Sequence, residues 1–562
     1  MGKVTSVLIV DGYNDEPGGL GVPPYIDVYP RYIAGALWSA DKSIRIDYVD
    51  VDSFRSRISA WLRRAKGYQV VVFIAGVVVP GRYIGAKPAE PEELVEWARR
   101  IEGPSKVLVG PAAKWGLGVK GGAIAYPPWY FKREGFDVLV TGDVEEYFYD
   151  MALHGPEKAD PGRVREDYKL VDKIAPKGAR IVKMHPSYGR NLIAEIETYR
   201  GCARWVTGGC SFCVEPLRGR PVGRSPEAIM REVEALYKAG VRHFRLGRQA
   251  DILVYGAKRL GDEEWPRPSP EDLRRLFHGI RSVAPSLQVL HIDNVNPGTI
   301  ARHPKASLEA LKVIVEYHTP GDVAAMGLET ADPRVARINN LNTYPEEVLE
   351  AIRIVNKVGA IRGWNGLPHL LPGINFILGL PGETRETYEL NREFLEKVLE
   401  EGLMVRRVNI RRILIIPVTR AARMGAGVKR KYEHLASSFT RWVRRRFDQE
   451  MLRRIVPKGT VMRGLWVEEC SGGICYARQP GSYPLVVAIP CRLPRGTYID
   501  KVYVTGVHSG RSLLGVPVPL SPSSSIKSLS TLTGSMESAA EVKKGASVHP
   551  FVSRPGWVCR EF

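Results

Sequence analysis

Six short apolar runs alternate with amphipathic helical stretches between residues 190 and 420 of the 562-residue chain. The runs are Leu192–Tyr199, His243–Gly247, Leu287–Asp293, Val323–Glu329, Ile374–Leu380 and Val408–Ile416. Helical stretches such as Ser225–Gly240 lie between them and end on a glycine, as helices commonly do. A repeat of strand and helix makes the strands parallel. The sequence therefore predicts an α/β fold with a partial (βα)6 barrel over residues 191–420, whose chemistry lies at the carboxyl ends of the strands.

A second series of strand-like runs precedes the barrel. They are Ser6–Tyr13, Ile44–Asp52, Tyr68–Gly76, Lys106–Pro111 and Phe136–Gly142, with helical segments such as Pro91–Glu102 between several of them. This order predicts a doubly wound, mostly parallel sheet over residues 1–150, followed by a linker over 151–190. No G-x-G-x-x-G follows the first run, which argues against a dinucleotide site.

The chain is basic, above all after the barrel. Lys and Arg number 81 against 61 Asp and Glu, a net charge of +20, which favours a polyanionic partner or reflects a generally basic surface. From Arg406 to Arg463 there are 17 basic side chains and three acidic ones. A helix here is expected to expose Arg441, Arg444, Arg445, Arg453 and Arg454 and to pack Phe439, Trp442, Phe447 and Leu452. Arginines beside aromatics suit RNA, and a solvated helix braced by the barrel is the alternative.

The last part of the chain contains strand-like runs. Tyr483–Pro490 and Tyr498–Leu520 resemble strands with tight turns, so residues 421–562 are expected to hold the basic helical segment and a small β-rich module.

The sequence contains no run of about 18 apolar residues, so we expect no membrane span. Seven unevenly spaced cysteines predict no disulfide framework, and the N-terminus lacks the features of a secretory signal. We therefore expect a cytoplasmic protein.

Three of the seven cysteines, Cys202, Cys210 and Cys213, lie within twelve residues at the end of the first barrel strand. Four thiolates would close a tetrahedral zinc or iron–sulfur site, whereas three on a cubane cluster leave one iron free for a small molecule. Histidine is absent from Tyr199 to Arg242, which disfavours zinc. A third, weaker interpretation is that the three thiols are buried and inert. The pattern favours an iron–sulfur cluster.

With this loop the chain resembles the radical SAM superfamily. The usual spacing there is C-x3-C-x2-C, and this C-x7-C-x2-C loop is four residues longer. Phe212 stands where the family places an aromatic residue beside the adenine of S-adenosylmethionine (SAM). The resemblance implies a [4Fe–4S] cluster whose free iron binds the amino and carboxylate groups of SAM. A ferredoxin- or flavodoxin-like electron donor would then drive cleavage of SAM to methionine and a 5′-deoxyadenosyl radical.

Other strand ends carry motifs similar to those of the methylthiotransferase branch of this superfamily. "RLGRQADILVYG" looks like its Gly-Gln turn, "HIDNVNP" and "MGLET" follow the next two strands, and "LGLPGET" resembles its Gly-x-Pro-Gly-Glu-Thr motif. The residues that the resemblance places near SAM or substrate are Arg248, Gln249, Asp251, Asp293, Asn294, Glu329, Gly379, Pro381 and Gly382. Each alone is also explained as a helix cap or a solvated turn.

Both ends of the chain add to the resemblance. "GLGVPPYIDVYPRYIAGAL" and "VTGDVEEYFYD" look like parts of a cobalamin-binding-like domain, but the first turn, "DGYNDEPGG", has no histidine for an Asp-x-His-x-x-Gly ligand motif. "VPKGTVMRGLWVEE", "ARQPGSYPLVVAIP" and "GVHSGRSLLGVPVPL" look like largely archaeal radical SAM proteins that end in a helix-hairpin-helix motif. The candidate motif, Leu529–Val542, has Met536 in place of its second glycine. Cys470, Cys475, Cys491 and Cys559 could hold a second cluster, although they contain no second C-x2-C pair.

The resemblance implies a SAM-dependent radical oxidoreductase or transferase. The basic segment and the methylthiotransferase-like barrel predict that it modifies RNA, with tRNA as one candidate. The alternative within enzymes is radical chemistry on a small metabolite or lipid, with the charge merely part of the surface. A non-catalytic iron–sulfur RNA-binding protein is the alternative from another class.

Overall fold

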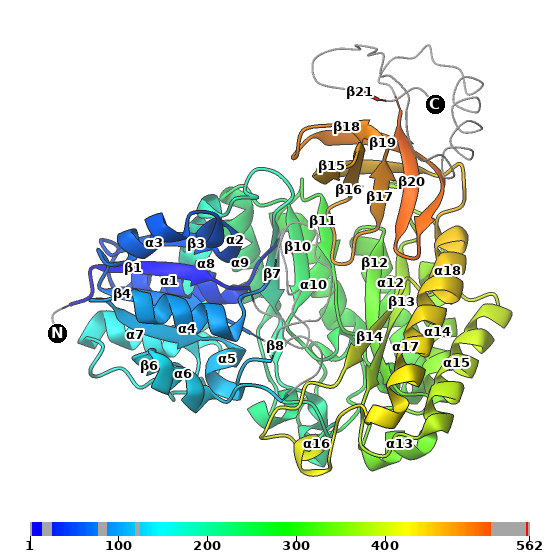
Figure 1. Ribbon diagram of the computed structural model, residues 1–562, viewed down its shortest axis with the longest axis horizontal. Coiled ribbons are helices and arrows are strands. Elements are labelled where there is room, and N and C mark those ends of the chain that lie inside the picture. The colour runs from blue at the N-terminus through cyan, green and yellow to red at the C-terminus, as the bar shows by residue number, and fades with distance from the viewer. Residues whose placement is uncertain (1–2, 14–24, 77–86, 119–123, 519–557, 560–562) are drawn as a thin grey trace.

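The structure is a computed structural model that describes residues 3–13, 25–76, 87–118, 124–518 and 558–559. Figure 1 shows an N-terminal lobe beside a central barrel, with an orange β-barrel above the central barrel. The mixed α/β class and the parallel sheets that the sequence predicts are confirmed. Within the described residues, no helix combines the length and the apolar character that crossing a membrane requires.

The N-terminal lobe is built on a five-stranded parallel sheet. Its order is β3 (Arg45–Asp50), β1 (Ser6–Asp11), β4 (Val70–Ile74), β5 (Ser105–Val109) and β6 (Val138–Leu139). All five runs predicted for the lobe form strands. Helices α1 (Val28–Ala40), α7 (Val144–His154) and α8 (Lys169–Gly178) share one apolar core, and α4 (Pro91–Arg100) packs into the core on the other side of the sheet. The carboxyl ends of these strands form one edge of the lobe.

The central barrel contains the six predicted strands in sequence order. They are β7 (Ile193–Glu197), β10 (His243–Gly247), β11 (Val289–His291), β12 (Asp322–Glu329), β13 (Leu370–Leu378) and β14 (Arg407–Arg412). Paired strands are parallel, and an Asn294–Ala325 bridge joins the two halves of the sheet. Amphipathic helices α9 (Pro226–Lys238), α10 (Pro270–Val283), α12 (Pro304–Tyr317), α14 (Pro345–Gly359) and α15 (Arg385–Glu400) connect them.

The lobe contributes backbone to both edges of this incomplete barrel. Strand β2 (Tyr25–Ile26) pairs in parallel with β7 at one edge. At the other edge, Ile124 forms a parallel bridge with Ile415, which lies just beyond β14. Neither contact was predicted, because two residues carry no periodic pattern. The lobe therefore spans the side that six strands leave open.

The region after the barrel begins with one helical run. It comprises α17 (Glu433–Trp442), a π-helical segment (Val443–Phe447) and α18 (Asp448–Ile455). Phe439, Phe447 and Leu452 are buried and Trp442 is half-buried, as predicted. Arg441, Arg445 and Arg453 are exposed, whereas Arg444 and Arg454 are only partly so. The helix thus packs its apolar side on the barrel and exposes arginines.

A small closed β-barrel follows, where the sequence predicts a β-rich module. It consists of β15 (Val461–Ser471), β16 (Ile474–Arg478), β17 (Val486–Ile489), β20 (Ser512–Pro517) and β19 (Tyr498–Ser509). The loop between β16 and β17 enters the central barrel, where the Tyr483 hydroxyl donates to Asp293 Oδ1 at 2.8 Å and the Arg407 guanidinium lies 4.2 Å from the Tyr483 ring centroid. The candidate helix-hairpin-helix, Leu529–Val542, lies outside the described residues.

The expectation that the cysteines form no disulfides is wrong for this small barrel. Cys470 and Cys475 face each other across the β15–β16 hairpin and form a disulfide, and Cys491 is also disulfide-bonded. Strand pairing brings Cys470 and Cys475 together, which their spacing in the sequence does not reveal. Thiols that are bonded in this way are not free to ligate iron, so the second cluster loses support.

Candidate active site

The three-cysteine loop leaves β7 through a short hairpin strand, β8 (Tyr199–Arg200). Cys202 then starts a 3-10 turn over Ala203–Thr207. Gly208 and Gly209 follow with φ of 76° and 62°, a left-handed backbone that favours glycine. This reversal leads directly to Cys210 and Cys213, and the Cys213 amide donates to the Cys210 carbonyl at 3.2 Å. The strand end and the two glycines therefore shape the loop.

The three thiols of this loop are free to act as ligands. Burial raises the pKa of Cys213, with the neighbouring Cys210 and Cys202 raising it further. Burial raises the pKa of Cys202 to about 12, so ligand binding must displace its proton. In the part of the chain that the structure describes, no three His, Cys, Asp or Glu side chains form a group placed to hold a metal ion. On a [4Fe–4S] cubane, three thiolates would leave one iron open.

Asn339 connects this loop to the next part of the site. The residue is fully buried just after α13 (Pro333–Ile338). Its backbone carbonyl accepts from the Ser211 amide at 2.9 Å, and its Oδ1 accepts from Ser211 Oγ at 2.6 Å. Its Nδ2 donates to the Pro381 carbonyl at 2.8 Å. Asn339 therefore holds the cysteine loop against the turn that the sequence assigns to adenine, a role that no signal in the sequence indicates.

Replacing Asn339 by Ala is expected to loosen the cysteine loop and to reduce the iron retained after anaerobic reconstitution. A matched control is Asn356→Ala, because the Asn356 side chain joins α14 to Met404 with bonds of 2.9 and 2.8 Å at a place remote from the loop. Both variants should lose stability, at about 1 kcal/mol for each bond removed. Equal iron retention by the two variants would contradict the role assigned to Asn339.

Glu329 and the Gly379–Gly382 turn form the side of the site where SAM is predicted. Glu329 ends β12 with a positive φ of 65°, an uncommon backbone for a side chain. Its Oε2 atom is buried and has no hydrogen-bond partner among the described residues, and burial raises the pKa of Glu329 to about 8. An orphaned buried oxygen suits a ligand that supplies a polar hydrogen, such as a ribose hydroxyl. Gly379 and Gly382 have φ of 95° and 92°, so this turn needs glycine.

Phe212 and the turn share a small apolar cluster. Phe212 is partly buried and packs with Val335, Leu380 and Ile413. The Gly379 and Leu380 amides donate to Glu383 Oε1 at 2.8 and 3.2 Å, which fixes the turn from behind. Phe212 therefore packs against Leu380 in the turn that is predicted to approach adenine.

The other predicted strand-end residues have partners within the protein. Arg248 lies 3.3 Å from Asp27 Oδ2, and Gln249 accepts from Thr198 Oγ1 at 3.1 Å. Asp251 Oδ2 accepts from Thr299 Oγ1 at 2.7 Å, and Asn294 Nδ2 donates to the Gln249 carbonyl at 3.4 Å. With these contacts the four residues hold the strand ends to neighbouring segments of the protein. Their contact with SAM or substrate stays a prediction.

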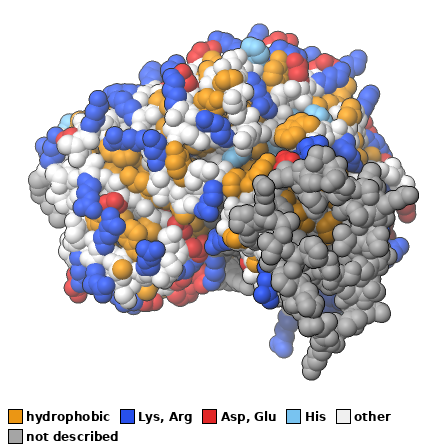
Figure 2. Space-filling view, turned by 90° about the horizontal axis from the view of Figure 1, so that it is seen from above, with side chains coloured by type: hydrophobic (Ala, Val, Ile, Leu, Met, Phe, Trp, Pro, Cys, Tyr) orange, Lys and Arg blue, Asp and Glu red, His pale blue; other side chains and the backbone are white. Residues whose placement is uncertain are grey.

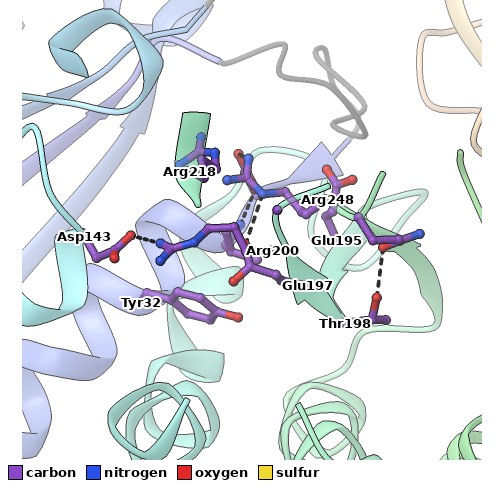
Figure 3. Close-up of polar contacts among 12 residues, drawn as sticks. Tyr32, Asp143, Glu195, Glu197, Thr198, Arg200, Arg218 and Arg248 are labelled. Carbon is purple, nitrogen blue, oxygen red and sulfur yellow. Dashed lines mark hydrogen bonds and ion pairs between the residues drawn. The ribbon is translucent and has the colours of Figure 1, made fainter. Parts of the chain in front are cut away.

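A buried ionic network joins the N-terminal lobe to the barrel strand that leads into the cysteine loop. Figure 3 shows Arg200 directed at Asp143 of the lobe, with which it forms an ion pair. Glu197 lies 2.9 Å from Arg165 and 3.7 Å from Arg248, and it accepts from the Tyr168 hydroxyl at 2.8 Å. Although burial opposes ionisation, the three neighbouring arginines lower the pKa of Glu197 to about 2. The end of β7 is therefore fixed by charges from both regions.

The lobe sheet ends in a cluster of hydrogen-bonded acids and tyrosines. Asp11 accepts from the Tyr48 hydroxyl at 2.9 Å, and the Tyr13 hydroxyl donates to Asp50 at 3.1 Å. The Gly12 amide donates to the Ile74 carbonyl at 2.9 Å, which joins the ends of β1 and β4. With Tyr13 where the ligand motif has histidine, these described residues do not fit a histidine-ligated cobalamin.

Comparisons with known proteins agree with this geometry. A family model described as the radical SAM superfamily matches residues 196–395, which include all three cysteines. The chain is 43% identical over 514 residues to an uncharacterized protein of Methanocaldococcus jannaschii, covering 90% of this chain and 92% of the relative. It is 25% identical over 282 residues to a ribosomal protein uS12 methylthiotransferase of Stenotrophomonas maltophilia, covering 46% of this chain and 55% of that one.

A second methylthiotransferase shows the same partial likeness. A tRNA-2-methylthio-N(6)-dimethylallyladenosine synthase of Pelotomaculum thermopropionicum is 24% identical over 265 residues, covering 46% of this chain and 53% of the relative. The chain thus spans about half the length of the methylthiotransferases it matches. One of them is named for a protein substrate and the other for a tRNA nucleoside.

Proposed function

This chain belongs to the radical SAM superfamily and uses a [4Fe–4S] cluster and SAM, and on that basis we propose that it modifies RNA by radical chemistry. Cys202, Cys210 and Cys213 would hold the cluster, which supplies the electron that cleaves SAM when it is bound. Glu329 and the Gly379–Gly382 turn would orient the nucleoside part of SAM. Tyr483, from the small β-barrel, contacts Asp293 and Arg407 of the central barrel, so the small β-barrel would lie near the substrate.

The observation that carries the RNA part of the proposal is a cationic groove beside α18. It has a volume of about 440 Å³ and is lined by Leu399, Arg445, Arg446, Gln449, Glu450, Arg453 and Arg454. Glu450 is the only acid in this lining and lies 3.1 Å from Arg454 and 3.7 Å from Arg453. Arg445 and Arg446 have no acidic partner within the described residues. Four guanidinium groups with one carboxylate suit a run of phosphates.

Net charge alone would not support this proposal. Figure 2 shows Lys and Arg side chains spread over much of the face seen from above rather than gathered in one patch. Scattered charge of this kind explains solubility and weak binding to any polyanion. The groove differs because its arginines line one concave site and two of them lack acidic partners.

Binding of tRNA measured by fluorescence anisotropy tests the role of the groove. The variant Arg445→Gln, Arg446→Gln, Arg453→Gln is expected to bind about tenfold more weakly and to reduce the slope of log K against log salt by about 2 to 3. The matched control is Arg57→Gln, Arg63→Gln, Arg267→Gln, which removes three exposed arginines elsewhere. An equal loss in both variants would show non-specific attraction and overturn the assignment of the groove.

A comparison of modified nucleosides from cells with and without the protein tests the substrate class. The proposal expects one modification to disappear from RNA in the deletion strain. An unchanged nucleoside profile would overturn it and favour a metabolite. An unchanged profile together with a mass change in a ribosomal protein would instead favour a protein substrate, as the name of one relative suggests.

A further inference from the structure

The four extra residues of the cysteine loop form a structure of their own. They fall in the 3-10 turn Ala203–Thr207, and this turn brings the Arg204 side chain inward, so that only 4% of it is exposed. Arg204 donates to the Cys210 sulfur at 3.1 Å and to the Asn340 carbonyl at 2.9 Å. A loop with the shorter C-x3-C spacing has no room for this turn. The insertion therefore places a buried cation against one of the cluster ligands.

Glu264 holds this guanidinium in place. Its Oε1 atom accepts from Arg204 Nε at 2.8 Å and from Thr207 Oγ1 at 3.0 Å. The Trp205 indole donates to the Gly261 carbonyl at 3.0 Å and fixes the turn to the same neighbouring loop. Glu264 thus holds Arg204 through Nε while Nη1 donates to the Cys210 sulfur, so this donor is preorganised.

We propose that Arg204 sets the reduction potential of the cluster, making it easier to reduce. The inference rests on the cluster site proposed above. One-electron reduction adds one negative charge to the cluster and its thiolates, and hydrogen bonds to the sulfurs and nearby positive charge stabilise the reduced form. Burial strengthens the effect, since water screens the guanidinium poorly there. Arg204 acts through Cys210 and is a positioning residue.

A purely structural role predicts something different. If Arg204 only held the loop through Asn340, its removal would lower iron retention and leave the potential of the remaining cluster unchanged. If its charge matters, removing Glu264 should move the potential in the opposite direction, because the guanidinium then loses its counter-charge. The two replacements thus separate charge from architecture.

The test is a dithionite titration of the reconstituted full chain, monitored by the EPR signal of the reduced cluster. Arg204→Gln is expected to lower the ratio of reduced to oxidised cluster at a fixed potential about tenfold, equivalent to about 59 mV for one electron. Glu264→Gln should shift the potential upward, and Arg204→Lys should restore part of the wild-type value.

The control is Arg420→Gln, because Arg420 donates to the Gly209 carbonyl of the same loop and, within the described residues, hydrogen-bonds to no sulfur. Its potential should stay near that of the wild type. Equal potentials in the wild type, Arg204→Gln and Glu264→Gln would overturn the inference and leave the proposed function standing if SAM is still cleaved. Failure of the wild type to assemble a cluster would overturn both.

Discussion

Replacing Cys202, Cys210 or Cys213 by Ala, one at a time, is expected to reduce SAM cleavage to the level of a cluster-free sample. Each thiolate would ligate one iron of the cubane, and two thiolates do not hold a [4Fe–4S] cluster firmly. The measurement is iron content and 5′-deoxyadenosine formed by each variant after anaerobic reconstitution and reduction. The effect should be the same at all three positions because no other free cysteine lies among the described residues.

The control for these variants is the double replacement of Cys470 and Cys475 by Ala. It removes the disulfide of the small β-barrel without leaving a single thiol, so stability should fall while the iron content and SAM cleavage persist. Loss of iron in this control would contradict the assignment and revive a second cluster. Retention of full activity by any one of the three single variants would contradict the ligand set.

Glu197→Gln is expected to lower the free energy of unfolding by about 3 kcal/mol at pH 7, because the folded protein favours the ionised carboxylate and lowers its pKa to about 2. Neighbouring arginines, opposed by burial, lower the pKa of Glu197 from 4.5 to about 2. The carboxylate therefore contributes its full stability above about pH 4.5 and loses it as the pH falls toward 2. Urea unfolding at pH 7 and pH 3 should show a large difference from the wild type at pH 7 and a smaller one at pH 3.

Glu234→Gln is the matched control, because Glu234 forms an exposed ion pair with Lys238 on α9 at 2.6 Å. Its effect should lie within about 0.5 kcal/mol at either pH. A loss at Glu197 no larger than that at Glu234, or one that does not change with pH, would show that the network between lobe and barrel contributes little to stability.

The sequence predicts the parallel frame because each strand is a short apolar run and the helices between them are amphipathic. All six barrel strands and all five lobe strands carry this signal, and the spacing of apolar residues marks the packed side of the helix that contains Phe439. Contacts that involve one or two residues were missed, such as β2 against β7 and Ile124 against Ile415. Register between distant segments has no local signature, so only the folded chain reveals it.

In the candidate site, too, the residues with a local sequence signal could be predicted and the others could not. The three cysteines were predicted because their spacing is itself a chemical signal, and the extra length of the loop was visible although its purpose was not. The positions of Arg204 and Asn339 could not be predicted, since an arginine in a basic chain and an asparagine after a helix are ordinary. The disulfide at Cys470 was missed because strand pairing, not sequence distance, brings its partner close.

Quantifying 5′-deoxyadenosine after the anaerobically reconstituted, reduced protein is mixed with SAM tests the central claim most directly. The account predicts that wild-type protein converts SAM to methionine and 5′-deoxyadenosine and that the Cys210→Ala variant does not. A protein that shows the EPR signal of a reduced [4Fe–4S] cluster and still leaves SAM intact would contradict it.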